Sequence, residues 1–139
     1  EMWANLTNVE CGILGKACNK FLSGTKITPE LLVNREKKLF YIEHAERGAI
    51  YDAARYHSLE GRTLICQWFA CDSCARAIVL SGIKKVIGHK QRMDTTPERW
   101  RASVDAGLEM IRNNGVEVEF YDGPIGGPPI IVNGEFWQP

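Results

Sequence analysis

The sequence predicts an α/β fold, a three-layer α/β/α sandwich around a mixed sheet of about five strands. Two observations favour this fold class. After residue 62, segments rich in β-branched and aromatic residues alternate with segments of helical periodicity, in the order strand, helix, strand, helix, strand. That order is typical of parallel strands joined by right-handed helical crossovers. The length also suits a single domain, residues 1–139, with one hydrophobic core.

The second half of the chain carries the clearest elements. Residues 63–69 are almost wholly apolar, as expected of a strand buried on both faces. A helix is predicted over 71–80, and Gly82 is expected to end it because glycine readily adopts the left-handed cap. The predicted order is completed by a strand over 83–87, an amphipathic helix over 97–113 capped by Thr96, and a strand over 116–121.

The first half is less regular. One or two short strands are predicted over 9–19, although two glycines interrupt them. Residues 21–34 are polar and are interpreted mainly as loop, with a helical turn able to start at Thr28 and Pro29. An alanine-rich helix is predicted over 45–57, since its apolar residues recur at helical spacing.

Residues 122–139 are predicted to form a C-terminal extension beyond the last strand of the sheet. Its first part is rich in glycine and proline, which favour turns and loops. Residues 130–137 then favour a small hairpin, with Asn133 and Gly134 in a type I′ turn.

Composition and charge limit the function classes. The chain carries 17 basic and 17 acidic residues, whereas proteins that bind a nucleic-acid backbone usually carry a basic surplus, so a small-molecule substrate is favoured over a polynucleotide. No apolar run approaches the roughly 20 residues that span a bilayer, and the start lacks the basic and apolar stretch of a signal peptide. The first residue is Glu1 rather than Met, which suggests a trimmed amino end.

Three residues are candidate metal ligands. His44 lies within the stretch EHAE of residues 43–46, and Cys71 and Cys74 form a Cys-x-x-Cys pair farther along the chain. One imidazole and two thiolates leave the fourth position of a tetrahedral zinc ion open, and an open position distinguishes catalytic from structural zinc. Two cysteines three residues apart at the start of a helix share one face, and the helix dipole favours their thiolates.

Glu46 completes the pattern. It follows His44 by two residues, so we expect its carboxylate to move protons beside the open position rather than to bind the metal. General acid–base catalysis of this kind typically accelerates a reaction by ~100- to 10,000-fold. His-x-Glu followed by Cys-x-x-Cys is a signature of zinc-dependent deaminases. Either half alone is weak evidence, because Cys-x-x-Cys also occurs in redox pairs and structural zinc sites, and His-x-Glu on ordinary surfaces.

The five cysteines form an odd number without the pattern of a disulfide scaffold. Since two of them are expected to be thiolate ligands, the reducing cytoplasm is the expected compartment. Cys11, Cys18 and Cys66 are interpreted as small buried hydrophobic residues. His57 and His89 are interpreted as solvated or core histidines, with His89 a weaker candidate for the rim of the pocket.

Two parts of the chain resemble the deoxycytidylate (dCMP) deaminases, a family within the cytidine deaminase superfamily. Residues 42–51 (IEHAERGAIY) are similar to the family's zinc-and-glutamate helix. Residues 68–78 (WFACDSCARAI) and 81–86 (SGIKKV) are similar to its second motif and the strand that follows. The resemblance extends over residues 9–121 and is sharp only in these segments. It implies the cytidine deaminase fold and the hydrolysis of dCMP to dUMP and ammonia, which supplies dUMP for thymidylate synthesis.

The resemblance also implies site residues. The family's zinc ligands correspond to His44, Cys71 and Cys74, and its proton-shuttling glutamate corresponds to Glu46. The cofactor is therefore expected to be Zn²⁺.

Substrate contacts are implied in the same way. Residues 18–21 are similar to the family's aromatic-Asn-Gly-aromatic turn, which makes Asn19 the expected contact to the sugar hydroxyl. The family's backbone contacts to cytosine carry over to Ala45, Phe69 and Ala70. Trp68 and Phe69 are otherwise expected in the core or in the pocket wall.

The phosphate contacts and three departures from the family pattern complete the comparison. Lys20 and Arg47 are weak candidates to hold a 5′-phosphate, because charged residues on a turn or helix are usually solvated. Ala70 replaces the usual proline before the first cysteine, Gly48 replaces the usual Asn, and the segment before Asn19 is shorter than in typical members. None of these departures removes a metal ligand.

The resemblance implies dCMP as substrate, a homo-oligomer such as a hexamer, and dCTP and dTTP as allosteric effectors. Two other readings stay open. The chain can be a related zinc deaminase that acts on another cytosine nucleoside or nucleotide, or on adenosine in tRNA, although zero net charge disfavours tRNA. It can also be a non-catalytic zinc-binding domain, which Glu46 disfavours because an idle zinc site needs no acid–base carboxylate.

Overall fold

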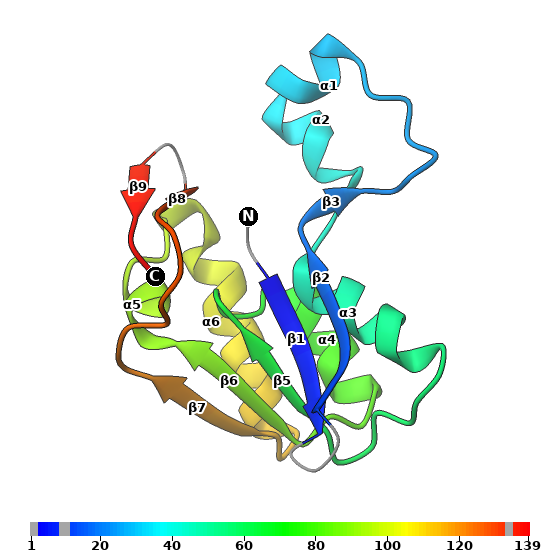
Figure 1. Cartoon of the computed structure of the whole chain (residues 1–139), viewed down its shortest axis with the longest axis vertical. Coiled ribbons are helices and arrows are strands. Elements are labelled where there is room, and N and C mark those ends of the chain that lie inside the picture. The colour runs from blue at the N-terminus through cyan, green and yellow to red at the C-terminus, as the bar shows by residue number, and fades with distance from the viewer. Residues whose placement is uncertain (1–2, 9–11, 133–134) are drawn as a thin grey trace.

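The centre of the fold is a five-stranded mixed sheet. Its strands are Trp3–Asn8 (β1), Gly12–Cys18 (β2), Thr63–Cys66 (β5), Lys85–His89 (β6) and Glu117–Tyr121 (β7). The computed structural model describes residues 12–132 and 135–139, and the backbone of residues 3–8. The strand order is β2-β1-β5-β6-β7; β1 is antiparallel to both neighbours, whereas β5, β6 and β7 are parallel (Figure 1). The predicted α/β class and mixed sheet are confirmed.

Two helices connect the parallel strands, as the alternating pattern predicts. They are α4 (Asp72–Leu80) and α6 (Glu98–Asn113). In the middle of the parallel strands, Val86 pairs in register with Leu64 and Val118, and these apolar side chains belong to the core beneath the helices. The strand predicted over 63–69 is shorter in the structure, because pairing with β6 ends at Cys66. The chain therefore leaves the sheet just before α4 begins.

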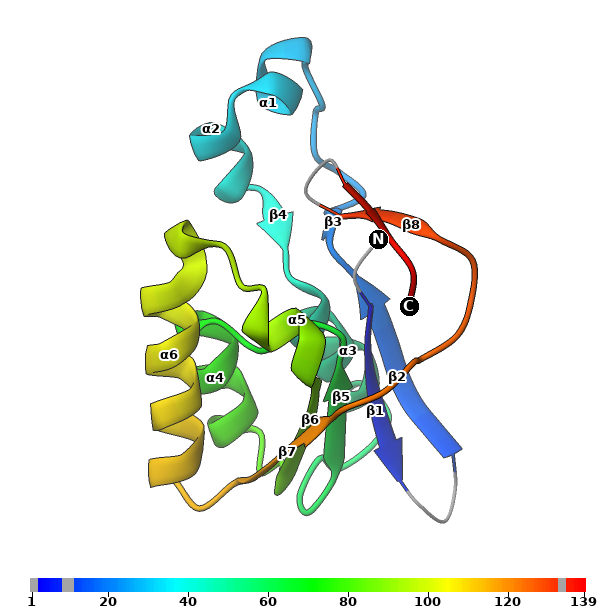
Figure 2. The same ribbon diagram turned by 90° about the vertical axis from the view of Figure 1, so that its left-hand side faces the viewer.

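The two faces of the sheet are covered differently. Helix α3 (Ala45–Ala54) packs against α4, and α3, α4 and α6 cover one face with a common core. Figure 2 shows residues 122–132 and 135–139 of the C-terminal segment on the opposite side of the sheet from α4 and α6. This segment ends in the predicted hairpin, in which β8 (Ile130–Val132) pairs antiparallel with β9 (Glu135–Trp137). The predicted Asn133–Gly134 turn lies outside the described residues.

Small residues bring α3 close to β2. A Cβ atom added at Gly48 would lie 2.8 Å from the Cβ of Ala17, and one added at Gly15 would lie 2.8 Å from the backbone oxygen of Ala49. Real Cβ atoms do not approach other atoms so closely, so a side chain at Gly48 would push the helix away from the sheet. The departure from the family's usual Asn at Gly48 thus has a packing reason.

A small lobe lies between the sheet and α3, and residues 21–34 within it were interpreted mainly as loop. It contains β3 (Lys20–Phe21), α1 (Pro29–Val33), α2 (Arg35–Leu39) and β4 (Ile42–Glu43). Thr28 caps α1 as predicted, since its hydroxyl oxygen accepts a hydrogen bond from the backbone N–H of Leu31 at 3.2 Å. Asn34 caps α2 by accepting from the N–H of Lys37 at 2.9 Å, a signal that sequence reasoning missed. The paired strands β3 and β4 close the lobe, which projects from the body of the protein (Figure 1).

The segment before α6 also differs from the prediction. A short helix, α5 (Lys90–Asp94), follows β6. The N-cap of α6 is Pro97 rather than Thr96. The Thr96 hydroxyl is used elsewhere, because it accepts a hydrogen bond from Nε1–H of Trp68 at 3.1 Å. Among the helices of the described ranges, none has the length and apolar character to cross a membrane.

Candidate metal centre and active-site pocket

The two helix starts bring the three predicted ligands together. His44 is the N-cap of α3, Cys71 is the N-cap of α4, and Cys74 lies in the first turn of α4. Nδ1 of His44 lies 3.4 Å from Sγ of Cys71 and 3.5 Å from Sγ of Cys74. The three candidate ligand atoms all lie within 4.8 Å of one another, and both cysteines are free thiols.

These distances fit a tetrahedral zinc ion. Zinc–sulfur bonds of about 2.3 Å and zinc–nitrogen bonds of about 2.0–2.1 Å place the sulfur and nitrogen ligands about 3.6 Å apart at the tetrahedral angle. The observed separations of 3.4 and 3.5 Å are close to this value. Imidazole and thiolate are also ligands that suit zinc. His44, Cys71 and Cys74 could therefore hold a zinc ion with three ligand atoms.

The pKa values of the two thiols shift in opposite directions. A hydrogen bond from Cys74, followed by one from His44, lowers the pKa of Cys71 to about 4. The hydrogen bond with Cys71, together with burial, raises the pKa of Cys74, so this second thiol keeps its proton. The hydrogen bond with Cys71 also raises the pKa of His44, although burial acts in the opposite direction. Because ligands must be deprotonated, a divalent metal entering this site would release protons from the group.

Glu46 lies in the first turn of α3, and its side chain is buried beside the metal site. Burial is the main cause that raises the pKa of its carboxyl group above the ordinary value of 4.5. A buried carboxyl group with a raised pKa is a candidate for proton transfer. A role of Glu46 in proton transfer stays a prediction.

In the metal-free protein, we expect the free energy of unfolding of Glu46→Gln to exceed that of the wild type by an amount that grows as the pH rises. Below about pH 4.5 the carboxyl group is protonated in both the folded and the unfolded chain, so the two proteins differ little. As the pH rises through the raised pKa of the folded state, the wild type loses stability relative to the Gln variant. The loss is about 1.4 kcal/mol for each unit of pKa difference. Denaturant titrations with a chelator, from about pH 4 to about pH 8, measure this effect, and parallel stability curves would contradict it.

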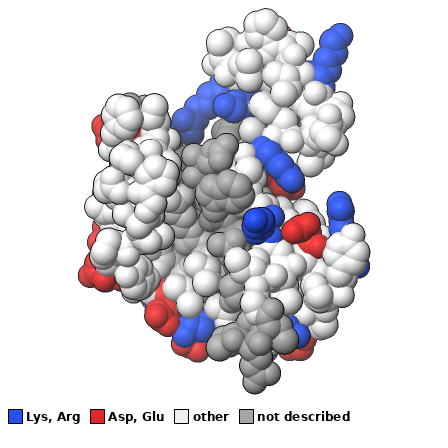
Figure 3. Space-filling view, in the orientation of Figure 1, with Lys and Arg blue, Asp and Glu red and all other residues white. Residues whose placement is uncertain are grey.

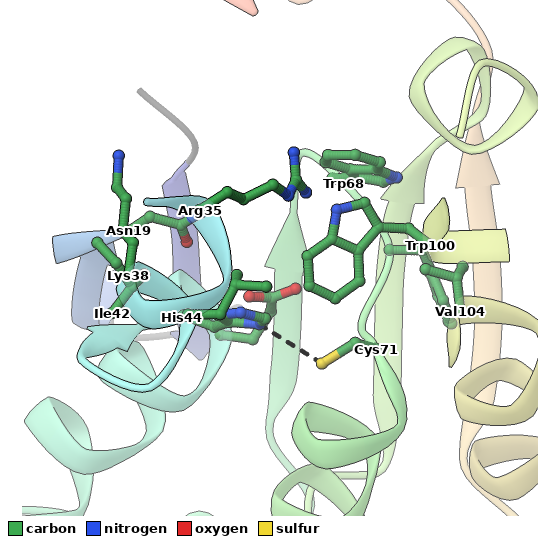
Figure 4. Close-up of a pocket in the computed structure, with 12 residues that line it drawn as sticks. Asn19, Arg35, Lys38, Ile42, His44, Trp68, Cys71, Trp100 and Val104 are labelled. Carbon is green, nitrogen blue, oxygen red and sulfur yellow. Dashed lines mark hydrogen bonds between the residues drawn. The ribbon is translucent and has the colours of Figure 1, made fainter. Parts of the chain in front are cut away.

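A cavity of about 380 Å³ opens beside the metal site (Figure 4). One wall is aromatic, and the ring of Trp100 meets that of His44 edge to face with centroids 5.9 Å apart. The opposite side carries polar and basic groups from the lobe. The lining residues are Asn19, Arg35, Lys38, Leu39, Ile42, His44, Glu46, Trp68, Phe69, Cys71, Trp100 and Val104. The cavity therefore joins the metal ligands, one buried carboxylate, aromatic surface and two cationic side chains.

Comparison with known families agrees with this geometry. Residues 4–90, more than half of the chain, match the family model described as the cytidine and deoxycytidylate deaminase zinc-binding region. The chain belongs to this deaminase family. Zinc is accordingly the metal expected at the His44, Cys71 and Cys74 site of this deaminase chain.

Curated relatives of this deaminase chain include two kinds of protein. It is 37% identical over 84 residues to an uncharacterized deaminase of Aliivibrio fischeri encoded in the luxG 3′ region, covering 60% of this chain and 55% of the relative. It is 38% identical over 76 residues to the deoxycytidylate deaminase of Enterobacteria phage T4, covering 54% of this chain and 35% of the relative. The chain thus spans about half or less of the length of the curated relatives it matches.

Solved structures support the fold of the deaminase chain. The dCMP deaminase of cyanophage S-TIM5 in complex with dCMP and dUMP superposes with a TM-score of 0.64 and 23% identity, covering 87% of this chain and 81% of that one. The apo form of the same enzyme gives a TM-score of 0.61 over 86% and 79% of the two chains, again at 23% identity. The predicted cytidine deaminase fold is therefore confirmed.

Two of the four predicted substrate-contact residues line the cavity, and two do not. Asn19 lines the cavity, and its Oδ1 accepts a hydrogen bond from the backbone N–H of Ala45 at 2.8 Å. Phe69 lines the cavity too, whereas Ala45 and Ala70 are buried and do not. The roles of these four residues toward a substrate stay predictions.

Neither predicted phosphate residue lines the cavity. Lys20 is exposed on β3, and Nε of Arg47 pairs with Oε1 of Glu43 at 2.6 Å, so neither residue lines the cavity. Arg35 and Lys38 from α2 line it instead, and Figure 4 shows both at its mouth. Figure 3 shows Lys and Arg side chains along the edge of the lobe that faces the hollow beside the body. The three basic residues among positions 35–38 were visible in the sequence as candidates for a phosphate contact. Only the folded structure shows which two of them, Arg35 and Lys38, line the cavity.

The structure also places the histidines and cysteines that were interpreted as lying outside the metal site. His89 does not line the metal-site cavity; it donates a hydrogen bond from Nε2–H to the backbone oxygen of Gly123 at 2.8 Å. His57 is exposed, as expected of a solvated histidine. Cys66 is buried as predicted, whereas Cys18 is only partly buried. Cys11 lies outside the described residues.

Proposed function

We propose that this chain is a zinc-dependent deaminase that hydrolyses dCMP to dUMP and ammonia and so supplies dUMP for thymidylate synthesis. The observation that carries the proposal is the buried carboxylate of Glu46 in the same cavity as the metal ligands. A redox pair or a purely structural zinc site has no use for a buried carboxylate beside an accessible metal position. Membership of the cytidine and deoxycytidylate deaminase family supports the same reaction class.

Metal and carboxylate have separate tasks in the proposed reaction. When bound by His44, Cys71 and Cys74, zinc supplies Lewis acidity that lowers the pKa of water from 15.7 towards about 7. Hydrolysis at C4 of cytosine also requires two proton transfers. A first proton leaves water and is delivered to ring nitrogen N3, and a second leaves the hydroxyl group added at C4 and is delivered to the departing amine. Glu46 is the group in the cavity that can accept and return these protons, because its pKa is raised by burial. One carboxylate thus acts first as base and then as acid.

The cavity also suits a cytosine nucleotide. The aromatic side chains of Trp68, Phe69 and Trp100 offer flat apolar surface to a pyrimidine ring. Since Oδ1 of Asn19 is occupied by Ala45, its amide N–H groups are left to donate to a sugar hydroxyl. Binding of dCMP and dUMP by the structurally similar cyanophage enzyme supports this substrate class.

The phosphate is proposed to lie between Arg35 and Lys38. These are the two cationic side chains that reach the cavity mouth, and a monophosphate carries charge that they can bind directly. They replace Lys20 and Arg47 as the phosphate candidates, because those two side chains do not line the cavity.

We expect Arg35→Ala or Lys38→Ala to raise KM for dCMP by roughly 10- to 100-fold, since a hydrogen bond to a charged group typically contributes about 1.5–3 kcal/mol. KM for deoxycytidine, which has no phosphate, should change little. Lys37→Ala is the matched control, because Lys37 lies on the same helix and its Nζ pairs with Glu30 at 3.0 Å instead. Initial-rate kinetics with both substrates measure the effect, and equal changes for dCMP and deoxycytidine would contradict the assignment.

The proposed activity is tested by ammonia release from cytidine, deoxycytidine, CMP, dCMP, dCTP and tRNA with zinc-loaded protein. Fastest turnover of dCMP is the expected result. A preference for the unphosphorylated nucleosides would overturn dCMP as the substrate and keep the deaminase chemistry. Release from adenosine in tRNA alone would move the chain to the tRNA deaminases, and zinc binding without any turnover would favour the non-catalytic alternative.

The remaining expectations are kept as proposals. Residues 1–139 are proposed to be a single domain that acts in the cytoplasm. A homo-oligomer such as a hexamer would have a candidate contact surface on the lobe, where large apolar side chains are exposed. These are Leu22, Ile27, Leu32, Val33, Leu39, Phe40 and Tyr41. Regulation by dCTP and dTTP stays a prediction, and we assign no residues to it.

A further inference from the structure

A buried arginine links the C-terminal extension to the wall of the active-site pocket. The guanidinium carbon of Arg92, on α5, lies 5.7 Å from the ring centroid of Trp68 and 5.2 Å from that of Trp137. Arg92 is only 8% exposed, and no carboxylate in the described part of the chain pairs with it. The two aromatic faces are therefore its main compensation for burial, which lowers its pKa.

Hydrogen bonds tie the indole rings of Trp68 and Trp137 to α5 and to the residues that directly follow it. Nε1–H of Trp137 donates to Oε1 of Gln91 at 2.8 Å. Nε1–H of Trp68 donates to the hydroxyl oxygen of Thr96 at 3.1 Å, and this hydroxyl donates in turn to the backbone oxygen of Met93 at 2.7 Å. Each indole is thus restrained at its polar edge as well as at its face.

The extension is anchored near its two ends. Near its start, Gly123 accepts the hydrogen bond from His89, and near its end Trp137 packs against both His89 and Arg92. Between these anchors, residues 124–131 lie over a hollow of about 1040 Å³ that is lined on the sheet side by Ile65 and Ile87. Trp137 is the buried residue of β9, so its ring is the part of this end of the extension that packs into the body of the fold.

We propose that Trp137 and Arg92 are positioning residues that hold Trp68 in the wall of the substrate pocket. The proposal rests on the proposed function, because it assigns Trp68 to the face that the substrate contacts. Glu46 and the metal ligands lie at the start of α3 and of α4, whereas Arg92 lies on α5 and Trp137 on β9. Loss of the stack should therefore weaken substrate binding while the proton-transfer machinery stays in place.

Steady-state kinetics on the zinc-loaded protein test this inference. We expect Trp137→Ala and Arg92→Ala to raise KM for dCMP by roughly tenfold, in line with the loss of one desolvated cation–π contact, with kcat within about twofold. Trp137→Phe and Arg92→Lys keep a ring and a cation, so they should recover most of the affinity. Phe136→Ala is the matched control, because Phe136 is the preceding residue of β9 and is 82% exposed.

A second readout does not depend on the substrate. The indole N–H signal of Trp68 in a nitrogen-labelled protein, assigned with Trp68→Phe, should shift in Trp137→Phe and stay in place in Phe136→Ala. If the wild type deaminates none of the tested substrates, the proposed function fails and the indole signal still decides the positioning role. A Trp137→Ala protein with the KM of Phe136→Ala, a fall in kcat without a rise in KM, or an unshifted Trp68 signal would overturn the inference. Should Trp137→Ala fail to fold, Arg92→Ala supplies the KM comparison and Trp137→Phe supplies the Trp68 indole signal.

Discussion

Glu46→Gln is expected to lower kcat for dCMP by roughly 100- to 10,000-fold and to leave zinc bound. Gln keeps the size and shape of the side chain but cannot accept a proton from water. Glu46 is not one of the three residues whose ligand atoms converge on the metal site, so its replacement removes no ligand. Ammonia release measures the turnover, and elemental analysis measures the zinc content of the same sample.

The matched control for this variant is Glu109→Gln. Glu109 is an exposed glutamate on α6 that does not line the cavity, so this protein should keep the wild-type kcat. Turnover of Glu46→Gln near the wild-type rate would remove Glu46 from proton transfer. Loss of zinc from Glu46→Gln would instead make Glu46 a metal ligand, and the open coordination position would then have to be assigned again.

Cys74→Ala is expected to abolish zinc binding and, with it, turnover. Cys74 is fully buried, so no solvent-exposed group can easily take its place as a ligand. Metal ions contribute several kcal/mol of transition-state stabilisation, which corresponds to a loss of at least about 1,000-fold in rate. Stability should fall as well, because binding of a metal to the folded state alone stabilises that state. Zinc content, ammonia release and thermal unfolding with and without zinc measure the three effects.

Cys66→Ala serves as the control for the loss of a buried cysteine. Cys66 is 2% exposed and belongs to the same core, but burial raises its pKa and it lies outside the group of converging ligand atoms. This variant should keep its zinc, and added zinc should still raise its unfolding temperature. A Cys74→Ala protein that binds zinc as the wild type does would exclude Cys74 from the metal site.

Local patterns in the sequence were sufficient for the parallel half of the fold and for the candidate metal centre. The alternation of apolar strands with helical periodicity depends on neighbouring residues, and it predicted β5, α4, β6, α6 and β7 in the correct order. Cys71 and Cys74 are placed on one face by the turn of a single helix, and Glu46 is tied to His44 by a spacing of two residues. These relations are set within a few residues, so the sequence expresses them directly.

The first part of the chain was harder to predict for a physical reason. Strand β1 pairs with β2 on one side and with β5, more than 50 residues later, on the other. Its polar residues give no strong strand pattern, and only pairing between distant segments makes it a strand. The short helices α1 and α2 likewise depend on capping side chains and on the paired strands β3 and β4 for their position.

The sequence by itself determined the candidate metal ligands, the candidate acid–base carboxylate and the order of the parallel strands and their helices. Only the tertiary structure decided which charged and aromatic side chains surround them. It brought Arg35 and Lys38 to the cavity in place of Lys20 and Arg47, and it joined Trp68 to Trp137 across a distance of 69 positions in the chain. Such contacts form between surfaces of separate elements, and their geometry depends on how the whole chain packs rather than on the spacing of any local motif.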